Sequence, residues 1–468
     1  MSSVTTNKMT NWRWVMCAML FFATTVNYMD RQVLSLTWKD FISPEFDWND
    51  DIYGTITAAF SFFYLVANIF AGKFVDFMGT KKGYFWAIVI WSLGAVMHAG
   101  CGWFTLKVMG ATGVMIATIS MYAFLACRCI LAAGEAGNFP AAIKVTAEYF
   151  PKKDRAFATS IFNSGASVGA LAAPMTIPLL AKAMGWEMAF IIIGVLGFIW
   201  AGIWVFIYDA PAKSKFVNEA ELNYMNQDEE TEKAAEVEVE EKQMSYAEAF
   251  SHRQTWSFAF GKFMTDGVWW FFLFWAPAYF SDQFGYTSDS PMGISLIFTL
   301  YAIVTVLSMF GGYLPKLFVE KKGMNPYQGR MLAMLIFAFF PVLALFAQPM
   351  GQYSAWWPAI IIGLVGAGHQ AWSANIFSTV SDMFPKSAVA TITGIGAAAG
   401  GLGSMLINKG SGVLFTYAAE QGSAFSFMGF EGKPAGYMII FCICAVAYLI
   451  GWVVMKALVP KYKPVVVK

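Results

Sequence analysis

Four ionisable side chains lie within stretches of this sequence that are otherwise apolar enough to cross a membrane. Asp30 and Arg31 are adjacent in one stretch, and Arg128 and Glu135 lie in another. A charged group at the centre of a bilayer costs about 3 kcal/mol or more, so such residues usually face a bundle interior or a water-filled cavity. Two arginines and two carboxylates in one interior suit the binding of an anion and the carriage of protons.

The composition is that of a polytopic membrane protein. Of the 468 residues, 58% are hydrophobic and 13% are charged, against about 25% charged in ordinary soluble domains. The net charge of +1 gives no reason to expect nucleic-acid binding. The six cysteines form no CxxC pair, so we expect no metal site. No P-loop or HExxH motif is present, and we expect neither a cofactor nor enzymatic activity.

The apolar stretches predict twelve membrane-spanning helices, because a span needs about 20 apolar residues. The twelve candidates cover 12–37, 52–72, 83–101, 113–148, 156–180, 187–208, 254–280, 292–314, 329–347, 355–380, 389–417 and 435–457. The segment 209–253 is rich in Glu and Lys and poor in aromatic residues, which predicts a solvated, partly helical connector. We therefore expect an N-terminal six-helix bundle over 1–208, a connector over 209–253 and a C-terminal six-helix bundle over 254–468.

Basic residues predict the orientation in the membrane. The loop at 38–51 is acidic, and the loop at 281–291 has no Lys or Arg. The loops after the second, fourth and eighth spans are basic, with Lys73, Lys81, Lys82, Lys152, Lys153, Arg155, Lys316, Lys321 and Lys322. Because basic loops stay on the cytoplasmic side, we expect both termini in the cytoplasm.

The two halves resemble each other in sequence. "EYFPKKDRAFATS" follows the fourth span, and "DMFPKSAVATIT" follows the tenth. Both segments place Phe-Pro-Lys after an acidic residue and before a helix of small residues. Parallel halves of six spans with a binding site between them at the midplane are a transporter architecture.

The motifs resemble those of a known family. "GKFVDFMGTKK" is similar to the loop signature of the major facilitator superfamily, although Phe77 stands where that signature usually has a basic residue. "NYMDR" and "RCILAAGEAGNFPAA" resemble its anion:cation symporters, and "KFMTDGVWWFFLFWAPAYF" resembles the bacterial hexuronate transporters. The resemblance covers essentially the whole chain. It implies an all-α membrane protein with twelve transmembrane helices in two pseudo-symmetric six-helix bundles.

The resemblance also implies roles for the four charged residues. Arg31 and Arg128 would hold the substrate anion, and Asp30 and Glu135 would take up and release protons. Arg128 and Glu135 are seven residues apart, so they share one face of a helix. An arginine fork matches a carboxylate in two parallel bonds. When a substrate takes the arginine, protonation of the carboxylate becomes easier. The alternative is a static ion-pair network that holds two helices together.

Aromatic and amide residues extend the predicted site. Tyr28 and Tyr64 would lie near the sugar according to the resemblance, and the alternative for both is helix packing. Trp269 or Trp270 would stack on the apolar face of the sugar ring. Asn138 follows Glu135 by three residues and would shape the same cavity.

The tenth span adds four polar residues within seven positions, which suggests a cavity wall that binds hydroxyl groups: His369, Gln370, Ser373 and Asn375. Lys262 and Asp266 are four residues apart in the seventh span and form either a structural pair or part of the site.

Charged residues at the ends of helices predict conformational latches. We expect Asp76 to pair with Lys81 or Lys82, and Asp382 to pair with Lys386.

Together these features predict a monomeric, proton-coupled symporter that imports a hexuronate or related sugar acid across a bacterial inner membrane. One alternative is a carrier or exchanger for another organic anion, such as an aldonate, sialic acid or an aromatic acid. The other is a non-transporting sugar-acid sensor.

Overall fold

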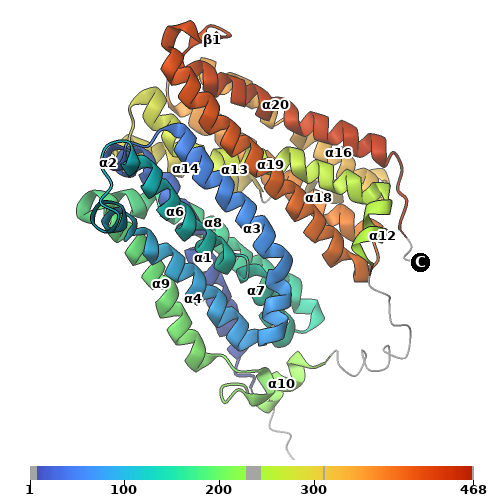
Figure 1. Cartoon of the computed structure of the whole chain (residues 1–468). Coiled ribbons are helices and arrows are strands. Elements are labelled where there is room, and N and C mark those ends of the chain that lie inside the picture. Colours follow the sequence, from blue (N-terminus) through green and yellow to red (C-terminus); the bar gives the residue numbers. More distant parts are fainter. Residues whose placement is uncertain (1–7, 228–243, 309–310, 312, 466–468) are drawn as a thin grey trace, which may run out of the picture.

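Long helices dominate the fold (Figure 1). The computed structural model describes residues 8–227, 244–308, 311 and 313–465. In this part of the chain the only strands are β1 (Ser426–Phe427) and β2 (Phe430–Glu431), which form one antiparallel hairpin. Helices suit these sequences because a helix satisfies its backbone hydrogen bonds internally, as the hydrocarbon core of a bilayer requires.

The first half of the chain supplies six predicted spans. Their helices are α1 (Trp12–Thr37), α3 (Asp50–Met78), α4 (Thr80–His98), α6 (Met115–Glu135) continued by α7 (Asn138–Tyr149), α8 (Lys152–Met184) and α9 (Trp186–Ile207). Short elements connect them: η1 (Trp38–Ile42), α2 (Ser43–Phe46), α5 (Cys101–Trp103) and η2 (Phe104–Val108). The fourth predicted span is therefore interrupted directly after Glu135.

The second half repeats this arrangement. Its spans are α13 (Arg253–Phe284), α14 (Pro291–Ser308) followed by α15 (Tyr313–Lys322), α16 (Pro326–Ala338) with η4 (Pro341–Phe346) and α17 (Ala347–Gly351), α18 (Trp356–Met383), α19 (Lys386–Gln421) and α20 (Lys433–Leu458). The connector contains η3 (Pro211–Lys213), α10 (Glu219–Met225) and α12 (Tyr246–Ser251), and η5 (Gly422–Ala424) precedes the hairpin.

Not every span is equally apolar. Within the described residues, seven helical segments are long and apolar enough to cross a membrane, and α4 with the bent α5–η2 segment makes an eighth. The other four predicted spans correspond to α1, α13, α18 and α19, which carry Asp30, Lys262, His369 and Asn408, all buried. Charged and polar residues lower the hydropathy of the helices that face the interior.

The two halves meet along α3 and α19, which pack closely (Figure 1). A Cβ atom on Gly54 would lie 2.8 Å from the carbonyl oxygen of Asn408 and 2.9 Å from the Cα of Gly412. The hydroxyls of Ser61 and Ser404 lie 2.9 Å apart across the same seam. Small residues allow this approach, as is common where membrane helices pack.

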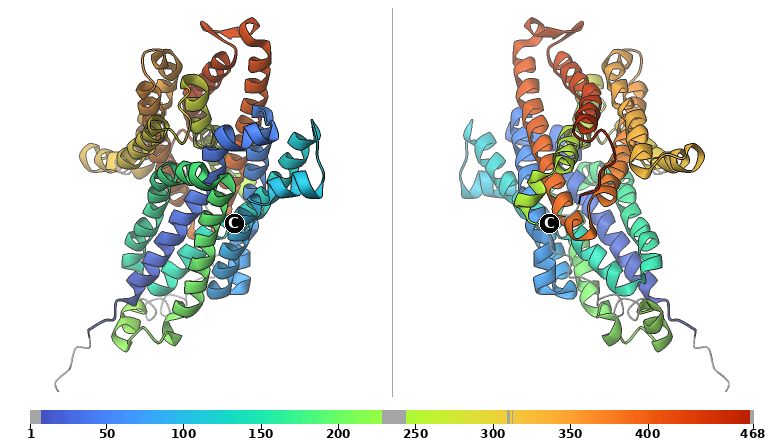
Figure 2. Two further views of the ribbon diagram at one scale, coloured as in Figure 1. Left: turned by 90° about the vertical axis from the view of Figure 1, so that its left-hand side faces the viewer. Right: turned by 90° about the vertical axis from the view of Figure 1, so that its right-hand side faces the viewer.

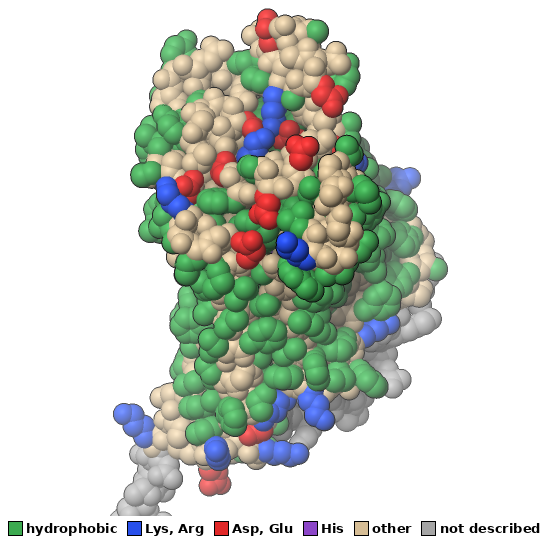
Figure 3. Space-filling view, turned by 60° about the vertical axis from the view of Figure 1, so that its left-hand side comes forward, with side chains coloured by type: hydrophobic (Ala, Val, Ile, Leu, Met, Phe, Trp, Pro, Cys, Tyr) green, Lys and Arg blue, Asp and Glu red, His purple; other side chains and the backbone are tan. Residues whose placement is uncertain are grey.

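The molecule has two chemically different ends. α10 and α12 mark one, the connector end, and α2 and the β1–β2 hairpin mark the opposite one, the α2 end (Figures 1 and 2). Figure 3 shows a band of hydrophobic side chains between them. The lower, connector end carries mainly Lys and Arg, whereas the upper end carries most of the Asp and Glu together with some Lys and Arg. An apolar band between polar ends fits a protein that spans a bilayer.

The connector is more ordered at its start than the sequence predicts. Glu221 of α10 is 0% exposed and accepts hydrogen bonds from the backbone N–H groups of Trp12 (2.9 Å) and Arg13 (3.1 Å). Its carboxylate also pairs with the Arg13 guanidinium at 3.2 Å and accepts a bond from Thr10. Glu221 therefore caps the N-terminus of α1, where free N–H groups favour a negative charge. Much of the acidic stretch predicted as solvated, 228–243, lies outside the described residues.

Replacing Glu221 by Ala is expected to lower the free energy of unfolding by about 3 kcal/mol, because it leaves a buried arginine and several N–H groups without their acceptor. Thermal unfolding of the purified protein measures this change. Glu219→Ala is the matched control, since Glu219 lies in the same helix and is exposed. Equal unfolding temperatures for the two variants would contradict the capping role.

Candidate functional site

Two helices bring the four charged residues together. α1 carries Asp30 and Arg31, and α6 carries Arg128 and Glu135. Their exposed fractions are 2%, 4%, 3% and 1% respectively. Groups buried this completely need partners, because an unpaired buried charge costs several kcal/mol.

The partner of Glu135 is Arg31. The Nη2 and Nε atoms of Arg31 donate to the same carboxylate oxygen of Glu135 at 2.7 Å and 3.0 Å. Arg128, two turns earlier on the helix of Glu135, makes no ion pair within 4 Å among the described residues. The pair thus joins α1 to α6, and α6 ends at Glu135.

Three aromatic rings surround the Arg31 guanidinium. Its central carbon lies 5.2 Å from the ring centre of Tyr28, 4.8 Å from that of Tyr64 and 5.0 Å from that of Trp270. Cations are attracted to such ring faces. The three rings come from α1, α3 and α13, so the cage includes residues of both halves. The two tryptophans occupy different places, because the Trp270 ring contacts Arg31 and the Trp269 ring does not.

Arg128 and Asp30 make no ion pair within 4 Å in the described part of the chain. Both carboxylate oxygens of Asp30, the Nη1 atom of Arg128 and the Oε1 atom of Glu135 are buried without a hydrogen bond. The Arg128 guanidinium lies 5.4 Å from the ring centre of Phe60. A buried polar group without a partner costs about 1–3 kcal/mol, and more when charged. An anion would satisfy Arg128, and a proton would neutralise Asp30.

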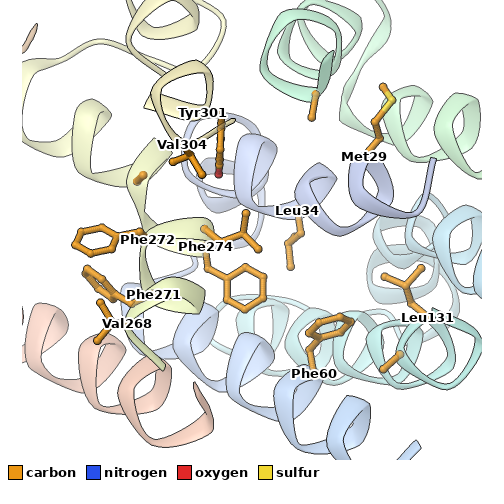
Figure 4. Close-up of a cluster of buried hydrophobic side chains, with 14 of the residues drawn as sticks. Met29, Leu34, Phe60, Leu131, Val268, Phe271, Phe272, Phe274, Tyr301 and Val304 are labelled. Carbon is orange, nitrogen blue, oxygen red and sulfur yellow. The ribbon is translucent and has the colours of Figure 1, made fainter. Parts of the chain in front are cut away.

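Apolar side chains close the interior beside this cluster. Figure 4 shows Leu34, Phe60 and Phe274 converging from α1, α3 and α13. The rings of Phe60 and Phe274 lie 6.1 Å apart. All three side chains are buried, and excluding water from the charges strengthens the electrostatic interactions among them.

Two small cavities lie between the halves. One, of about 150 Å³, is lined by Tyr28 of α1, Asn163 of α8, Trp269 of α13 and Gln370 of α18, among others. The other, of about 170 Å³, is lined by Tyr64 and by Lys262, Asp266 and Trp270 of α13, among others. Tyr28, Tyr64, Trp269, Trp270 and Gln370 therefore border a cavity, as a site at the interface requires.

The C-terminal half contributes a stacked histidine. The His369 ring lies parallel to Trp269 with centres 5.5 Å apart, and its Nδ1 atom lies 2.6 Å from the Tyr448 hydroxyl. His369 is thus a buried, hydrogen-bonded residue that supports a cavity-lining tryptophan. Lys262 and Asp266 form an ion pair at 2.7 Å, and both border the second cavity.

Three predicted site residues border neither central cavity. Asn138 accepts a hydrogen bond from the Tyr84 hydroxyl at 2.7 Å, within the N-terminal half. The amide nitrogen of Asn375 donates to the carbonyl oxygens of Gly311 (3.0 Å) and Ala371 (2.8 Å), which holds α18 against Gly311. Ser373 is half-buried and borders neither central cavity.

The predicted latches pair differently. Asp76 pairs with Lys144 of α7 at 2.7 Å, and Lys81 pairs with Asp209 at 2.8 Å. The predicted pairing of Asp76 with Lys81 or Lys82 is therefore wrong, and Lys82 is exposed. Asp382 pairs with Arg330 at 2.6 Å, while the side chain of Lys386 lies outside the described residues. None of these pairs bridges the two halves.

A cluster of four charges, Lys39, Asp50, Asp282 and Lys433, bridges the halves at the α2 end. Lys39 pairs with Asp282 at 2.8 Å, and Lys433 pairs with Asp50 at 2.8 Å and with Asp282. Burial lowers the pKa of Lys39, but the two carboxylates outweigh it and raise that pKa above its usual value. Lys39 therefore stays charged near neutral pH, because it loses its proton only at higher pH.

Other contacts reinforce this closure. Lys409 pairs with Asp51 at 2.5 Å, and Lys182 pairs with Asp289 at 2.8 Å. Below them, the rings of Trp38 and Tyr53 stack 4.0 Å apart, and Trp275 packs edge-on at 5.0 Å from Tyr53. Among the described residues, every ion pair between the halves lies at the α2 end. The protein is therefore sealed there by charges and aromatic rings.

Replacing Lys433 by Gln is expected to shift the protein toward a state open at the α2 end, because two buried carboxylates would then share one lysine. Spin labels at Val108 and Tyr417, both about half exposed at this end, would report a larger population of long distances in a background without the native cysteines. Lys456→Gln, at the connector end of the same helix, is the control. Identical distance distributions for both variants would refute the latch role.

Sequence reasoning missed two site residues. Tyr301 borders the first cavity, and its hydroxyl is buried without a hydrogen-bond partner among the described residues. Asn27 is 1% exposed, and neither amide atom of its side chain has a partner there. Asn27 precedes Asp30 by three residues, so helical spacing could have identified it, whereas nothing in the sequence distinguishes Tyr301. No group of three His, Cys, Asp or Glu residues suited to a metal occurs in the segments that the structure describes.

Comparisons with known proteins agree with this architecture. Residues 20–407 match the sequence model described as "Major Facilitator Superfamily". The chain is 29% identical over 452 residues to the "Hexuronate transporter" of Escherichia coli K12, which covers 95% of this chain and 94% of that protein. It is 26% identical over 446 residues to the "Probable galactarate/D-glucarate transporter GarP" of the same organism, with 92% and 94% covered.

The fold also resembles solved structures. A crystal structure of a bacterial homologue of the human lysosomal transporter Spinster, described as inward-facing and occupied, superposes with a TM-score of 0.70. Sequence identity is 18%, and the match covers 96% of this chain and 97% of the other. At this identity the likeness concerns the fold.

Proposed function

This chain belongs to the major facilitator superfamily, and from that premise we propose that it imports a hexuronate or a related sugar acid together with protons. The Arg31–Glu135 pair is the main observation that supports this proposal. It sits in an aromatic cage shared by both halves, beside a buried arginine and a buried aspartate that have no ion-pair partner among the described residues. The relatives named for hexuronate and for galactarate and glucarate support a sugar acid as the substrate.

Each group has a defined part in the proposed cycle. Arg128 receives the substrate carboxylate, because it needs an anion and a guanidinium provides a matching fork. As the anion approaches, Arg31 interacts with the substrate as well as with Glu135, and its interaction with Glu135 weakens. Protonation of Glu135 and Asp30 then becomes more favourable, because each carboxylate loses positive charge that had stabilised its ionised form. Substrate and protons therefore favour each other's binding.

The cavity walls suit a sugar. Tyr28, Tyr64 and Gln370 offer hydrogen-bonding groups, and Trp270 offers a flat apolar face. Asn375 and Asn138 are bonded elsewhere, so in this proposal they support the helices that carry the site.

The proton gradient supplies the driving force. With one proton for each monovalent anion, transport moves no net charge, and one pH unit supplies about 1.4 kcal/mol. A second proton would add about 2.3 kcal/mol for each 100 mV of membrane potential. We place the basic connector end in the cytoplasm according to the positive-inside rule, which makes the sealed α2 end the outer one.

A dicarboxylic sugar acid is the second candidate substrate. GarP bears the name of a galactarate and glucarate transporter, and Lys262 borders a central cavity as a further cation. A second carboxylate would compete with Asp266 for this lysine.

Uptake into proteoliposomes tests the proposal. An inward proton gradient should drive accumulation of labelled glucuronate, and unlabelled galacturonate should compete. Stronger competition by galactarate than by galacturonate would favour the dicarboxylate. Binding of sugar acids without any uptake would favour a sensor, and gradient-independent counterflow alone would favour an exchanger. If no sugar acid binds or moves, the proposed substrate class is wrong.

A further inference from the structure

A large cavity in the described part of the chain lies outside the central site. It has a volume of about 470 Å³ and is found at the connector end, between the start of α13 and the segment that follows α20. Its walls include His252, Arg253, Gln254, Lys461, Lys463 and Val465.

Hydrogen bonds fix the outer wall of this cavity. The Gln254 side chain donates to the carbonyl oxygen of Lys463 at 2.9 Å. The backbone N–H of Val465 donates to the carbonyl oxygen of Met383 at 2.7 Å. The Tyr462 hydroxyl donates to the carbonyl oxygen of Asp382 at 3.1 Å. The segment after α20 therefore folds back against α13 and α18, and the cavity is part of the fold.

The charges around the cavity have one sign. Arg253, Lys461 and Lys463 contribute three cationic side chains, and no Asp or Glu is among the lining residues. None of the three makes an ion pair within 4 Å to a described residue. The Nε2 atom of His252 is buried with no hydrogen-bond partner among those residues.

The backbone adds to this positive character. α13 begins at Arg253, and its N-terminus has no side-chain cap and no acidic residue in the first turn. The free N–H groups of a long helix carry a partial positive charge that favours phosphate. Cationic side chains, a histidine nitrogen and a helix N-terminus thus surround one space.

Exposed aromatic residues near the cavity fit a position at the level of lipid headgroups. Phe250, Trp256 and Tyr462 are 44%, 52% and 44% exposed. In sequence they lie within two positions of residues that line the cavity. Trp and Tyr concentrate where a membrane protein crosses from hydrocarbon to water. Leu458, Val459 and Val465 give the cavity an apolar wall as well.

From these features, we propose that the cavity binds the phosphate group of an anionic phospholipid in the leaflet at the connector end. The cations and the helix N-terminus would contact the phosphate, and the apolar wall would contact the glycerol and the upper acyl chain. Basic pockets between membrane helices bind lipid headgroups in this way. Free phosphate shares the chemistry of the headgroup, but the aromatic and apolar surroundings favour the lipid.

Native mass spectrometry of the full chain, released from nanodiscs that contain phosphatidylglycerol and phosphatidylcholine, tests the proposal. We expect the wild type to retain phosphatidylglycerol in preference to phosphatidylcholine. In the triple variant R253Q/K461Q/K463Q, affinity for phosphatidylglycerol should fall about a hundredfold. The control K73Q/K321Q/K322Q removes three exposed charges elsewhere and should retain the lipid.

Two outcomes would overturn the proposal. One is equal retention of the two lipids by the wild type, a result that needs no variant and so does not depend on how the triple variant folds. The other is a thermal stabilisation by inorganic phosphate that the triple variant loses while lipid retention is unchanged. That result would assign the cavity to a soluble phosphate compound instead.

Discussion

Replacing Glu135 by Gln is expected to abolish proton-driven accumulation of substrate. The substitution keeps the size of the side chain but removes the group that carries a charge or a proton. Arg31 then loses its only ion-pair partner among the described residues, and no change of charge at position 135 accompanies substrate binding. With one proton per anion, the wild type should concentrate substrate about tenfold for each imposed pH unit, whereas the variant should reach no more than the external concentration.

Counterflow separates coupling from binding in this variant. Exchange of labelled for unlabelled substrate at equal pH needs no net proton movement, so Glu135→Gln should retain it in part. Glu320→Gln, which alters an exposed glutamate at the connector end, should accumulate substrate like the wild type. If Glu135→Gln still accumulates substrate tenfold, another carboxylate couples transport, and Asp30 would be the first to examine.

The sequence predicted the composition of the charged cluster but not its internal pairing. Spacing within one helix shows that Arg128 and Glu135 share a face. It does not show which residue of another helix meets that face. Glu135 pairs with Arg31, 104 positions away in sequence, because α6 ends at Glu135 and the following helix, α7, packs on α1. Such a contact depends on how the two helices are rotated about their axes, which spacing within either helix does not fix.

The latches illustrate the same limit. Asp76 and Lys81 are only five positions apart in sequence, yet Asp76 pairs with Lys144, and Lys81 pairs with Asp209. The loop between α3 and α4 turns at Gly79, whose φ of 75° is readily adopted only by glycine. This turn separates the two side chains. The cluster at the α2 end was missed altogether, since Asp50 and Lys433 are 383 positions apart.

The polar residues of the helices that face the interior could be recognised in the sequence. α1, α13, α18 and α19 are the spans with low hydropathy, and α1, α13 and α18 supply much of the charged cluster and the cavity walls. A helix in lipid tolerates buried charges only when it faces an interior, so low hydropathy in a predicted span indicates a cavity wall. Asn375 shows why this is insufficient for single residues. It is polar and lies in α18, yet its amide bonds to backbone carbonyls.

Arg128→Lys is expected to reduce uptake at least a hundredfold while the protein still folds. Lysine keeps the positive charge but cannot form two parallel bonds to a carboxylate, and its shorter reach leaves the anion poorly placed. Arg128 makes no ion pair to a described residue, so its replacement breaks no salt bridge. The unfolding temperature should therefore change little. That combination distinguishes a substrate ligand from a structural cation, whose loss would lower stability first.

Arg31→Lys and Arg155→Lys complete the comparison. Arg31 holds Glu135 and contacts three rings, so Arg31→Lys should lower both uptake and stability. Arg155 bonds to backbone carbonyls near the end of α7, at the connector end, and Arg155→Lys should leave uptake within about threefold of the wild type, the loss expected from one weakened exposed bond. Near-normal uptake by Arg128→Lys would mean that the substrate carboxylate binds elsewhere, and Arg31 or Lys262 would then be the cation that receives it.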